Sequence, residues 1–203
     1  NIRKNIKRRS VMTKTEKDLG KIESEIGKTS FLNGKGLGNE VSYYVFDYDP
    51  KDEILVREYI DKLIKKDKEF GDGYKLKVYD VYDLMIDLLE SEGYLEDCFE
   101  MEKNDGMNYL VESVNDLLRM SDNNDYFTEY VEENTPEKAI VFLIGVGKIF
   151  PFVRSHKILN NLHQSFNKAP VVMFYPGKYD GQSLELFGEF KDDNYYRAFP
   201  LIK

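Results

Sequence analysis

Two aspartates separated by a single residue, Asp47 and Asp49, end an apolar and aromatic stretch of the chain. Carboxylates at this spacing after a buried strand can act as nucleophile and general acid beside Mg²⁺, which is the chemistry of phosphoester hydrolysis. Pro50 and Lys51 follow, however, where such a site needs a hydroxyl or a small side chain, and Asp-x-Asp-Pro is also an ordinary turn after a strand. We favour the turn, and a Mg²⁺-dependent phosphoester or nucleotide-processing enzyme is the alternative interpretation of this pair.

A glycine-rich loop precedes the stretch that carries these aspartates. Glycines allow backbone N–H groups to come close to a phosphate, but in a dinucleotide-binding domain the glycine loop follows a strand and opens a helix. Here the loop comes before a strand, so we favour a structural loop, with phosphate or partner binding as the alternative. The candidate residues of this loop are Gly34, Lys35, Gly36, Gly38 and Asn39.

A second group of glycines follows the apolar run at 139–144. It does not form the Walker A pattern GxxxxGK[ST], because Ile149 follows Gly147-Lys148 and Phe142 occupies the position of the first glycine. We therefore expect no ordinary hydrolysis of nucleoside triphosphates.

Arg154 lies near the start of the helix predicted after this run, where backbone N–H groups and the helix dipole favour an anion. Together with Gly145, Gly147 and Lys148, it could form an anion pocket at the carboxyl edge of the predicted sheet. The alternative, which we favour, is that Arg154 pairs with a carboxylate such as Asp47.

The other polar candidates indicate neither a metal site nor an activated nucleophile. Two histidines two turns apart on one helix, as in the ridge of His156, Asn160 and His163, are separated by ~10 Å and cannot hold one ion unaided. Arg197 follows two tyrosines, which is typical of an ion-pair or stacking residue. The single cysteine, Cys98, lies in an acidic segment that raises the pKa of a thiol. We keep His156, Asn160 and Arg197 as anion- or partner-binding candidates.

The elements that position these residues are clearest at 139–177. A continuous apolar run at 139–144 predicts a strand buried on both faces, and a second such run follows at 171–175. Between them, Pro151 suits the first position of a helix whose apolar residues recur as far as Phe166. Strand, helix and strand within about 40 residues form a βαβ unit with parallel strands and a right-handed crossover.

Hydrophobic periodicity predicts the remaining elements. Helical spacing covers 81–134, which is too long for a simple crossover and predicts a helical insert between two strands. We therefore predict an α/β fold with a mostly parallel sheet of four or five strands, helices on both faces, and a degenerate P-loop-like or Rossmann-like arrangement. The other predicted elements are a helix at 15–28, strands at 41–47 and 74–80, a helix from Lys51, a helical turn at 182–187 and a strand at 194–201.

Charge is distributed unevenly along a chain whose net charge is −8. Residues 1–35 carry ten Lys and Arg against four Asp and Glu, whereas residues 80–134 carry seventeen Asp and Glu against two Lys and Arg. We predict a basic flexible arm at 1–14 and a single domain at 15–203. The acidic segment repels phosphate backbones and suits a basic protein partner, while the arm keeps weak nucleic-acid contact as a second alternative function.

Composition excludes several classes of protein. An apolar content of 41% excludes general disorder. No apolar run reaches the ~18 residues of a membrane span, and no stretch typical of a signal peptide precedes the predicted fold. One cysteine permits no internal disulfide, which is ordinary in a reducing cytoplasm. We expect a cytoplasmic protein without a membrane partner, and no motif implies a cofactor.

Five segments taken together resemble the BrxB family, a small component of bacterial BREX anti-phage defence systems. The resemblance extends from about residue 21 to the end, with little of it in the acidic helical segment and none in the first ten residues. The segments are FLNGKGLGNEV and YYVFDYDPKDE near the start, then FLIGVGKIFPFVRSHKILNNL, VVMFYPGKYDGQSLELFG and DNYYRAFPL.

The resemblance implies a protein that acts with larger BREX partners, namely an ATPase, a DNA adenine methyltransferase and the phosphatase-like PglZ. It brings no catalytic residues, because the family has no agreed ones. It implies a required assembly component that docks on PglZ. We therefore expect a non-catalytic assembly or regulatory role rather than an enzyme.

Overall fold

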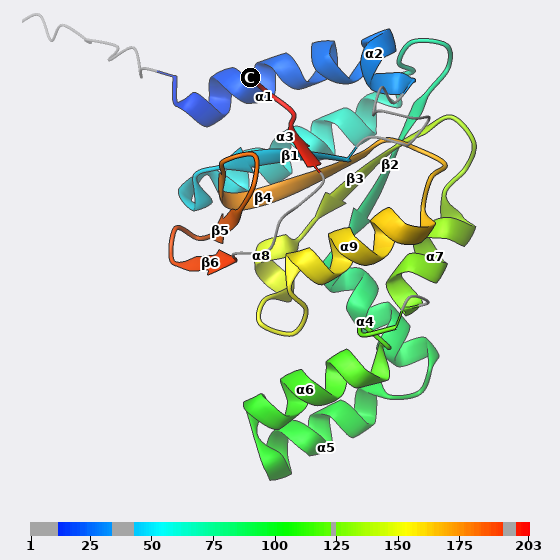
Figure 1. Cartoon of the computed structure of the whole chain (residues 1–203), viewed down its shortest axis with the longest axis vertical. Coiled ribbons are helices and arrows are strands. Elements are labelled where there is room, and N and C mark those ends of the chain that lie inside the picture. The colour runs from blue at the N-terminus through cyan, green and yellow to red at the C-terminus, as the bar shows by residue number, and fades with distance from the viewer. Residues whose placement is uncertain (1–11, 34–42, 123–124, 193–197) are drawn as a thin grey trace, which may run out of the picture.

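The computed structural model describes residues 12–33, 43–122, 125–192 and 198–203 (Figure 1). Its centre is a parallel sheet with the strand order β2-β3-β4-β1-β7. The predicted α/β fold with a mostly parallel sheet is therefore confirmed. The parallel strands are β1 (Tyr43–Tyr48), β2 (Lys75–Asp80), β3 (Ala139–Ile144), β4 (Val171–Tyr179) and β7 (Ala198–Pro200).

One face of the sheet is covered by three helices, α1 (Lys14–Ile26), α2 (Thr29–Leu32) and α3 (Glu53–Lys66) (Figure 1). Their apolar residues share a core with Phe142 of β3 and Phe174 of β4, whose ring centroids are 4.8 Å apart. The central strands are apolar on both faces because helices also cover the other side.

The opposite face carries the helices between β2 and β4: α4 (Val81–Ser91), α5 (Leu95–Asp105), α6 (Met107–Leu117), α7 (Tyr126–Asn134), α8 (Val146–Ile149) and α9 (Ser155–Ser165). Alternate strand residues such as Val141 and Met173 share a second core with these helices. The pair α5 and α6 lies beyond α4, away from the sheet (Figure 1). The chain between β2 and β3 is thus built from helices, as its hydrophobic spacing predicted.

The segment after β4 is a β-hairpin, so the predicted helical turn at 182–187 is wrong. Strand β5 (Leu184–Leu186) pairs antiparallel with the end of β4, and β6 (Phe190–Asp192) pairs with β5. Leu184 and Leu186 are buried and the residue between them is half buried, which is the alternation of a strand. The short segment allows few residues to distinguish a period of two from a helical turn.

Strand β4 also continues past the predicted end of the strand at 171–175. Gly177 permits this continuation, because a Cβ at this position would lie 2.1 Å from the carbonyl oxygen of Glu185 in β5. A glycine inside a strand commonly marks such a close approach of two backbones. The Pro-Gly pair therefore lies within β4 and brings β5 against it.

The helix predicted from Pro151 begins later, at Ser155. The residues before it form a turn that closes the short helix α8, with the N–H of Phe152 donating to the carbonyl oxygen of Ile149 at 2.8 Å. Arg154 has an extended backbone and is the N-cap residue of α9. Pro151 therefore belongs to the turn before α9 and does not occupy the first position of the helix.

The strand order creates a topological switch point between the neighbouring strands β1 and β4. From β1 the chain passes through α3 to β2 at one edge of the sheet, whereas from β4 it passes to β7 at the other edge. Right-handed crossovers place connections that run in opposite directions on opposite faces of a sheet. Ligands of open α/β sheets bind outside the carboxyl ends of the strands at such a point.

Candidate functional site

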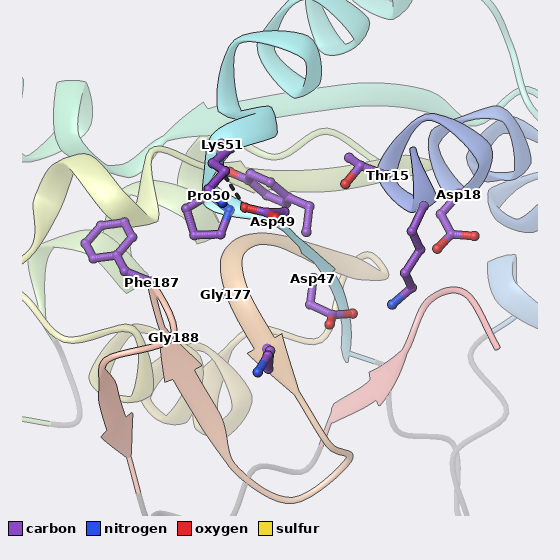
Figure 2. A pocket seen from close by; sticks show the side chains of 12 residues that line it. Thr15, Asp18, Asp47, Asp49, Pro50, Lys51, Gly177, Phe187 and Gly188 are labelled. Atoms are coloured by element: carbon purple, nitrogen blue, oxygen red, sulfur yellow. Dashed lines mark hydrogen bonds between the residues drawn. The ribbon is translucent and has the colours of Figure 1, made fainter. Parts of the chain in front are cut away.

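A cavity of about 470 Å³ lies at this switch point, beyond the carboxyl ends of β1 and β4 (Figure 2). Its walls come from the start of α1, from β1 and the turn after it, from Gly177 and Lys178 of β4, and from the turn after β5. Asp49-Pro50 ends β1 and begins the 3-10 helix η1 (Pro50–Asp52). The chain therefore turns at the sheet edge, and this turn forms one side of the cavity.

Asp47 and Asp49 both line this cavity, but their carboxylates have different surroundings. Asp49 is exposed, and its Oδ1 accepts a hydrogen bond from the N–H of Lys51 at 3.0 Å, which caps η1 (Figure 2). Asp47 is half buried, and its Oδ2 accepts a long hydrogen bond of 3.4 Å from the N–H of Tyr179. Because it caps η1, Asp49 acts as a turn residue. Asp47 is therefore the better candidate for a catalytic carboxylate.

The first turn of α3, next to the cavity, is surrounded by the protein's own carboxylates. Asp52 and Glu53 begin this helix directly after Asp49 and the turn. Glu53 accepts hydrogen bonds from the hydroxyl of Tyr48 and, at 2.7 Å, from Nε of Arg57. Burial, followed by the bond to Glu53, raises the pKa of the Tyr48 hydroxyl far above its usual range. Because these carboxylates already complement the helix dipole, this N-terminus does not suit a bound phosphate.

Lys148, a candidate for an anion pocket, is held by two carboxylates. Its Nζ lies 2.5 Å from Oδ2 of Asp80 and 3.0 Å from Oδ1 of Asp83. Burial by itself would lower the pKa of Lys148, but the hydrogen bonds to both aspartates raise it above its usual value. Gly145 has a φ of 79°, and a Cβ there would lie 2.2 Å from Oδ1 of Asp80. This glycine therefore makes room for Asp80, which is the N-cap of α4.

Arg154, His156 and Asn160 do not line the cavity that contains Asp47. Arg154 is exposed and lines a separate, much smaller cavity of about 30 Å³. Among the described residues, no ion pair joins Arg154 to Asp47. His156 is half buried and Asn160 exposed on α9. The structure thus divides the predicted residues between two places along the sheet edge.

The described part of the chain gives little support for a metal site or for a reactive cysteine. No group of three or more His, Cys, Asp or Glu is placed there to hold a metal ion. His163 stacks on the ring of Tyr43, with centroids 4.7 Å apart, and so acts as a packing residue. Burial, and then Asp97, raises the pKa of the Cys98 thiol. No described helix has the length and apolar character needed to cross a membrane.

Several predicted site residues lie outside the described part of the chain, as do residues 1–11 of the predicted basic arm. Their proposed contacts with phosphate, nucleic acid or a partner stay predictions from the sequence. These site residues are Gly34, Lys35, Gly36, Gly38, Asn39 and Arg197.

An aromatic cluster beside the cavity was missed by the sequence reasoning. The ring centroid of Phe150 lies 4.8 Å from that of Phe190 and 6.4 Å from that of Phe187. Phe187 lines the cavity with a φ of 57°, which is unusual for a bulky residue. Gly147 lies against this ring, because a Cβ there would be 3.0 Å from Cε1 of Phe187. The Phe-Gly pair at 187–188, between two short apolar stretches, was the available signal of a hairpin turn.

Comparison with known proteins shows a family match. The family model described as BREX protein BrxB matches residues 77–201. A BREX protein BrxB of Bacillus cereus (strain H3081.97) is 45% identical over 194 residues, which cover 94% of this chain and 99% of that protein. A BREX protein BrxB of Escherichia coli O9:H4 (strain HS) is 30% identical over 184 residues, covering 91% of this chain and 90% of that protein. No solved structure matches the chain.

Proposed function

The chain belongs to the BrxB family of BREX proteins, and from this premise we propose that it is a non-catalytic assembly or regulatory component that binds a protein partner. The family resemblance of the sequence is thereby confirmed, and a role as a BREX component follows from it. The proposal goes further in naming PglZ as the first partner and the cytoplasm as the place of action.

The observation that supports a non-catalytic role is the charge at the first turn of α3, beside the switch point. In phosphate-binding α/β sheets, a helix N-terminus at this edge presents backbone N–H groups to the anion. Here Asp49, Asp52 and Glu53 surround the first turn of α3, and Lys148 is held by carboxylates. A phosphate bound at this first turn would meet these carboxylates, although three lysines, Lys14, Lys51 and Lys178, line the cavity beside it, together with Asp18, Asp47 and Asp49. Recognition of another macromolecule accounts better for this edge than phosphate chemistry does.

Co-purification with PglZ tests the proposed partner. We expect the tagged protein, expressed together with PglZ, to retain PglZ through affinity purification and to elute with it as one species in size-exclusion chromatography. An unrelated acidic protein with the same tag is the control. Recovery of PglZ no higher than with this control would refute binding to PglZ.

A Mg²⁺-dependent phosphoester or nucleotide-processing enzyme is the second candidate, because the cavity with Asp47 lies where α/β enzymes bind substrates. This candidate requires the purified protein to hydrolyse p-nitrophenyl phosphate or a nucleoside triphosphate only when Mg²⁺ is present. Asp47→Asn should abolish that turnover, and Asp61→Asn, at an exposed position of α3, should leave it unchanged. Absence of turnover, or turnover that survives Asp47→Asn, rejects the candidate.

A further inference from the structure

The helices α5 and α6 form a hairpin at the end of the molecule opposite α1 (Figure 1). Gly106 joins the two helices with a φ of 83°. Cys98, Leu110 and Val114 are buried in the core that the hairpin shares with α4. We call residues 95–117 the acidic hairpin, and all of its other residues are exposed or half buried.

The acidic hairpin carries carboxylates that are not paired with any cation among the described residues. Residues 95–117 contain seven Asp and Glu and a single Lys. No ion pair between described residues includes any of these seven carboxylates. Glu23 of α1 differs, because its carboxylate binds Lys66 at 2.7 Å and Lys68 at 3.0 Å. Among the described residues, the hairpin carboxylates thus form no ion pairs of the kind that Glu23 of α1 forms.

Like charges also stand one turn apart within the acidic hairpin. Glu96 and Glu100 are four residues apart on α5, and Glu112 and Asp116 repeat this spacing on α6. Like-charged pairs at this spacing destabilise an isolated helix by about 0.2–0.5 kcal/mol each. A cationic surface placed against the hairpin would remove this repulsion, so binding and hairpin stability favour the same partner.

Large apolar side chains are exposed among these charges. Phe99 is 54% exposed, Met107 45% and Tyr109 50%, although each has buried neighbours on the same helices. Aromatic residues and Met are enriched in protein–protein interfaces, and apolar residues exposed among polar ones are typical of such surfaces. The hairpin therefore offers contact area that a purely solvated acidic face would lack.

The charge of the acidic hairpin decides between the possible occupants. A nucleic acid brings phosphates, which seven carboxylates repel. A second copy that presented the same hairpin would bring the same negative charge. A protein surface rich in Lys and Arg, with an apolar centre, matches both the charge and the exposed rings.

We propose that the acidic hairpin is the docking surface for a basic protein partner. The partner's Lys and Arg side chains pair with the hairpin carboxylates, and its apolar centre covers Phe99, Met107 and Tyr109. This inference rests on the proposed function and assigns it a surface and a partner chemistry. PglZ, the partner proposed above, is the probe for the test.

A double neutralisation, Glu96→Gln with Glu100→Gln, tests this surface. The matched control, Glu58→Gln with Asp61→Asn, removes two exposed carboxylates from one face of α3. We expect the hairpin variant to bind PglZ about tenfold more weakly in a titration, with the control unchanged. The hairpin variant should change the thermal midpoint of the free protein little, because the relief of a like-charge repulsion is offset by the loss of Glu96 from the first turn of α5, where a negative charge complements the helix dipole. A merely structural role of these glutamates would lower that midpoint.

Phe99→Ala provides a second, charge-neutral variant, and it should also weaken binding because it removes an exposed contact residue. If both hairpin variants bind PglZ as the wild-type protein does, the docking surface is refuted and the proposed function stands. If the wild-type protein itself does not bind PglZ, the proposed partner is refuted. The hairpin is then also refuted as a docking surface for PglZ.

Discussion

Lys148 illustrates how pairing decides what a charged side chain can do. By residue type and position it could bind a phosphate at the sheet edge, but its ammonium is held by Asp80 and Asp83 and lies 5.5 Å from the ring centroid of Tyr82. One positive and two negative charges leave this cluster with a net negative charge. An anion would have to break one of these ion pairs to reach the lysine, which disfavours a phosphate site here.

Gly145→Ala is expected to destabilise the protein. The added Cβ would have to adopt a φ of 79° and would lie 2.2 Å from Oδ1 of Asp80, so the free energy of unfolding should fall by more than about 1 kcal/mol. Urea unfolding followed by circular dichroism measures the change.

Gly20→Ala is the matched control for this substitution, because a Cβ at Gly20 in α1 would meet nothing within 4 Å. Alanine in a helix interior should raise the free energy of unfolding by about 0.5–1 kcal/mol. If Gly145→Ala were as stable as the wild-type protein, the close packing of Asp80 against this glycine would be disproved.

At the scale of elements, an ion-pair cluster joins α1 to α3 and to the turn after α3. The start of α1 also lines the cavity. Glu23 of α1 binds Lys66 and Lys68. Hydrogen bonds to Lys66 first, and then to Lys68, lower the pKa of the Glu23 carboxyl below its usual value. Both lysine side chains are about half exposed, at 52% and 51%, so solvent screens the pairs and their contribution is small.

The lowered pKa of Glu23 fixes the sign of its pH dependence. The folded protein holds this proton more weakly than the unfolded chain does, so the pairs stabilise the fold above the ordinary pKa of glutamate. This stabilisation is lost as pH falls through the lowered pKa. We therefore expect Glu23→Gln to lower the thermal midpoint at about pH 7 and to have less effect at about pH 3.

Glu58→Gln is the control for this experiment, since Glu58 is 60% exposed and lies 3.9 Å from Lys62. It should change the thermal midpoint little at either pH. An effect of Glu23→Gln that had the same size at both pH values would show that charge pairing is not its cause.

On the scale of the whole molecule, burial differs sharply between the sheet and the acidic hairpin. Every residue of β3 up to Leu143 is buried, and so are the first seven residues of β4. In α5 only Cys98 is buried, and in α6 only Leu110 and Val114. Opening the hairpin exposes little apolar surface, whereas opening the sheet exposes both cores.

This difference predicts a gradient in hydrogen exchange. Amides of α5 and α6 should exchange through local opening, well before those of β3 and β4, which should require global unfolding. Adding PglZ should slow exchange in the hairpin and leave the central strands unchanged, if the hairpin is the docking surface. Mass spectrometry of peptides from residues 95–117 and 139–144 measures both effects. Equal protection of hairpin and sheet in the free protein would contradict the expected gradient.

The sequence by itself determined the features that depend on neighbouring residues. The apolar runs at 139–144 and 171–175 predicted the two central strands, because a strand buried on both faces must be apolar at every position. Helical spacing predicted the helices at 81–134, and the absence of a Walker A pattern could be read directly. The short stretch at 182–187 was predicted wrongly, since two or three residues do not define a period.

Only the tertiary structure decided which of the candidate residues meet. The strand order brings Asp47 to the switch point between β1 and β4, and it brings Asp80 to Lys148 from a distant part of the chain. Contacts of this kind depend on how strands are ordered and paired, which local periodicity does not encode. The same holds for the acidic hairpin: its charge can be counted from the sequence, whereas only the fold shows that its carboxylates form no ion pair with the other described residues, although Lys157 donates to Asn115 at 3.0 Å.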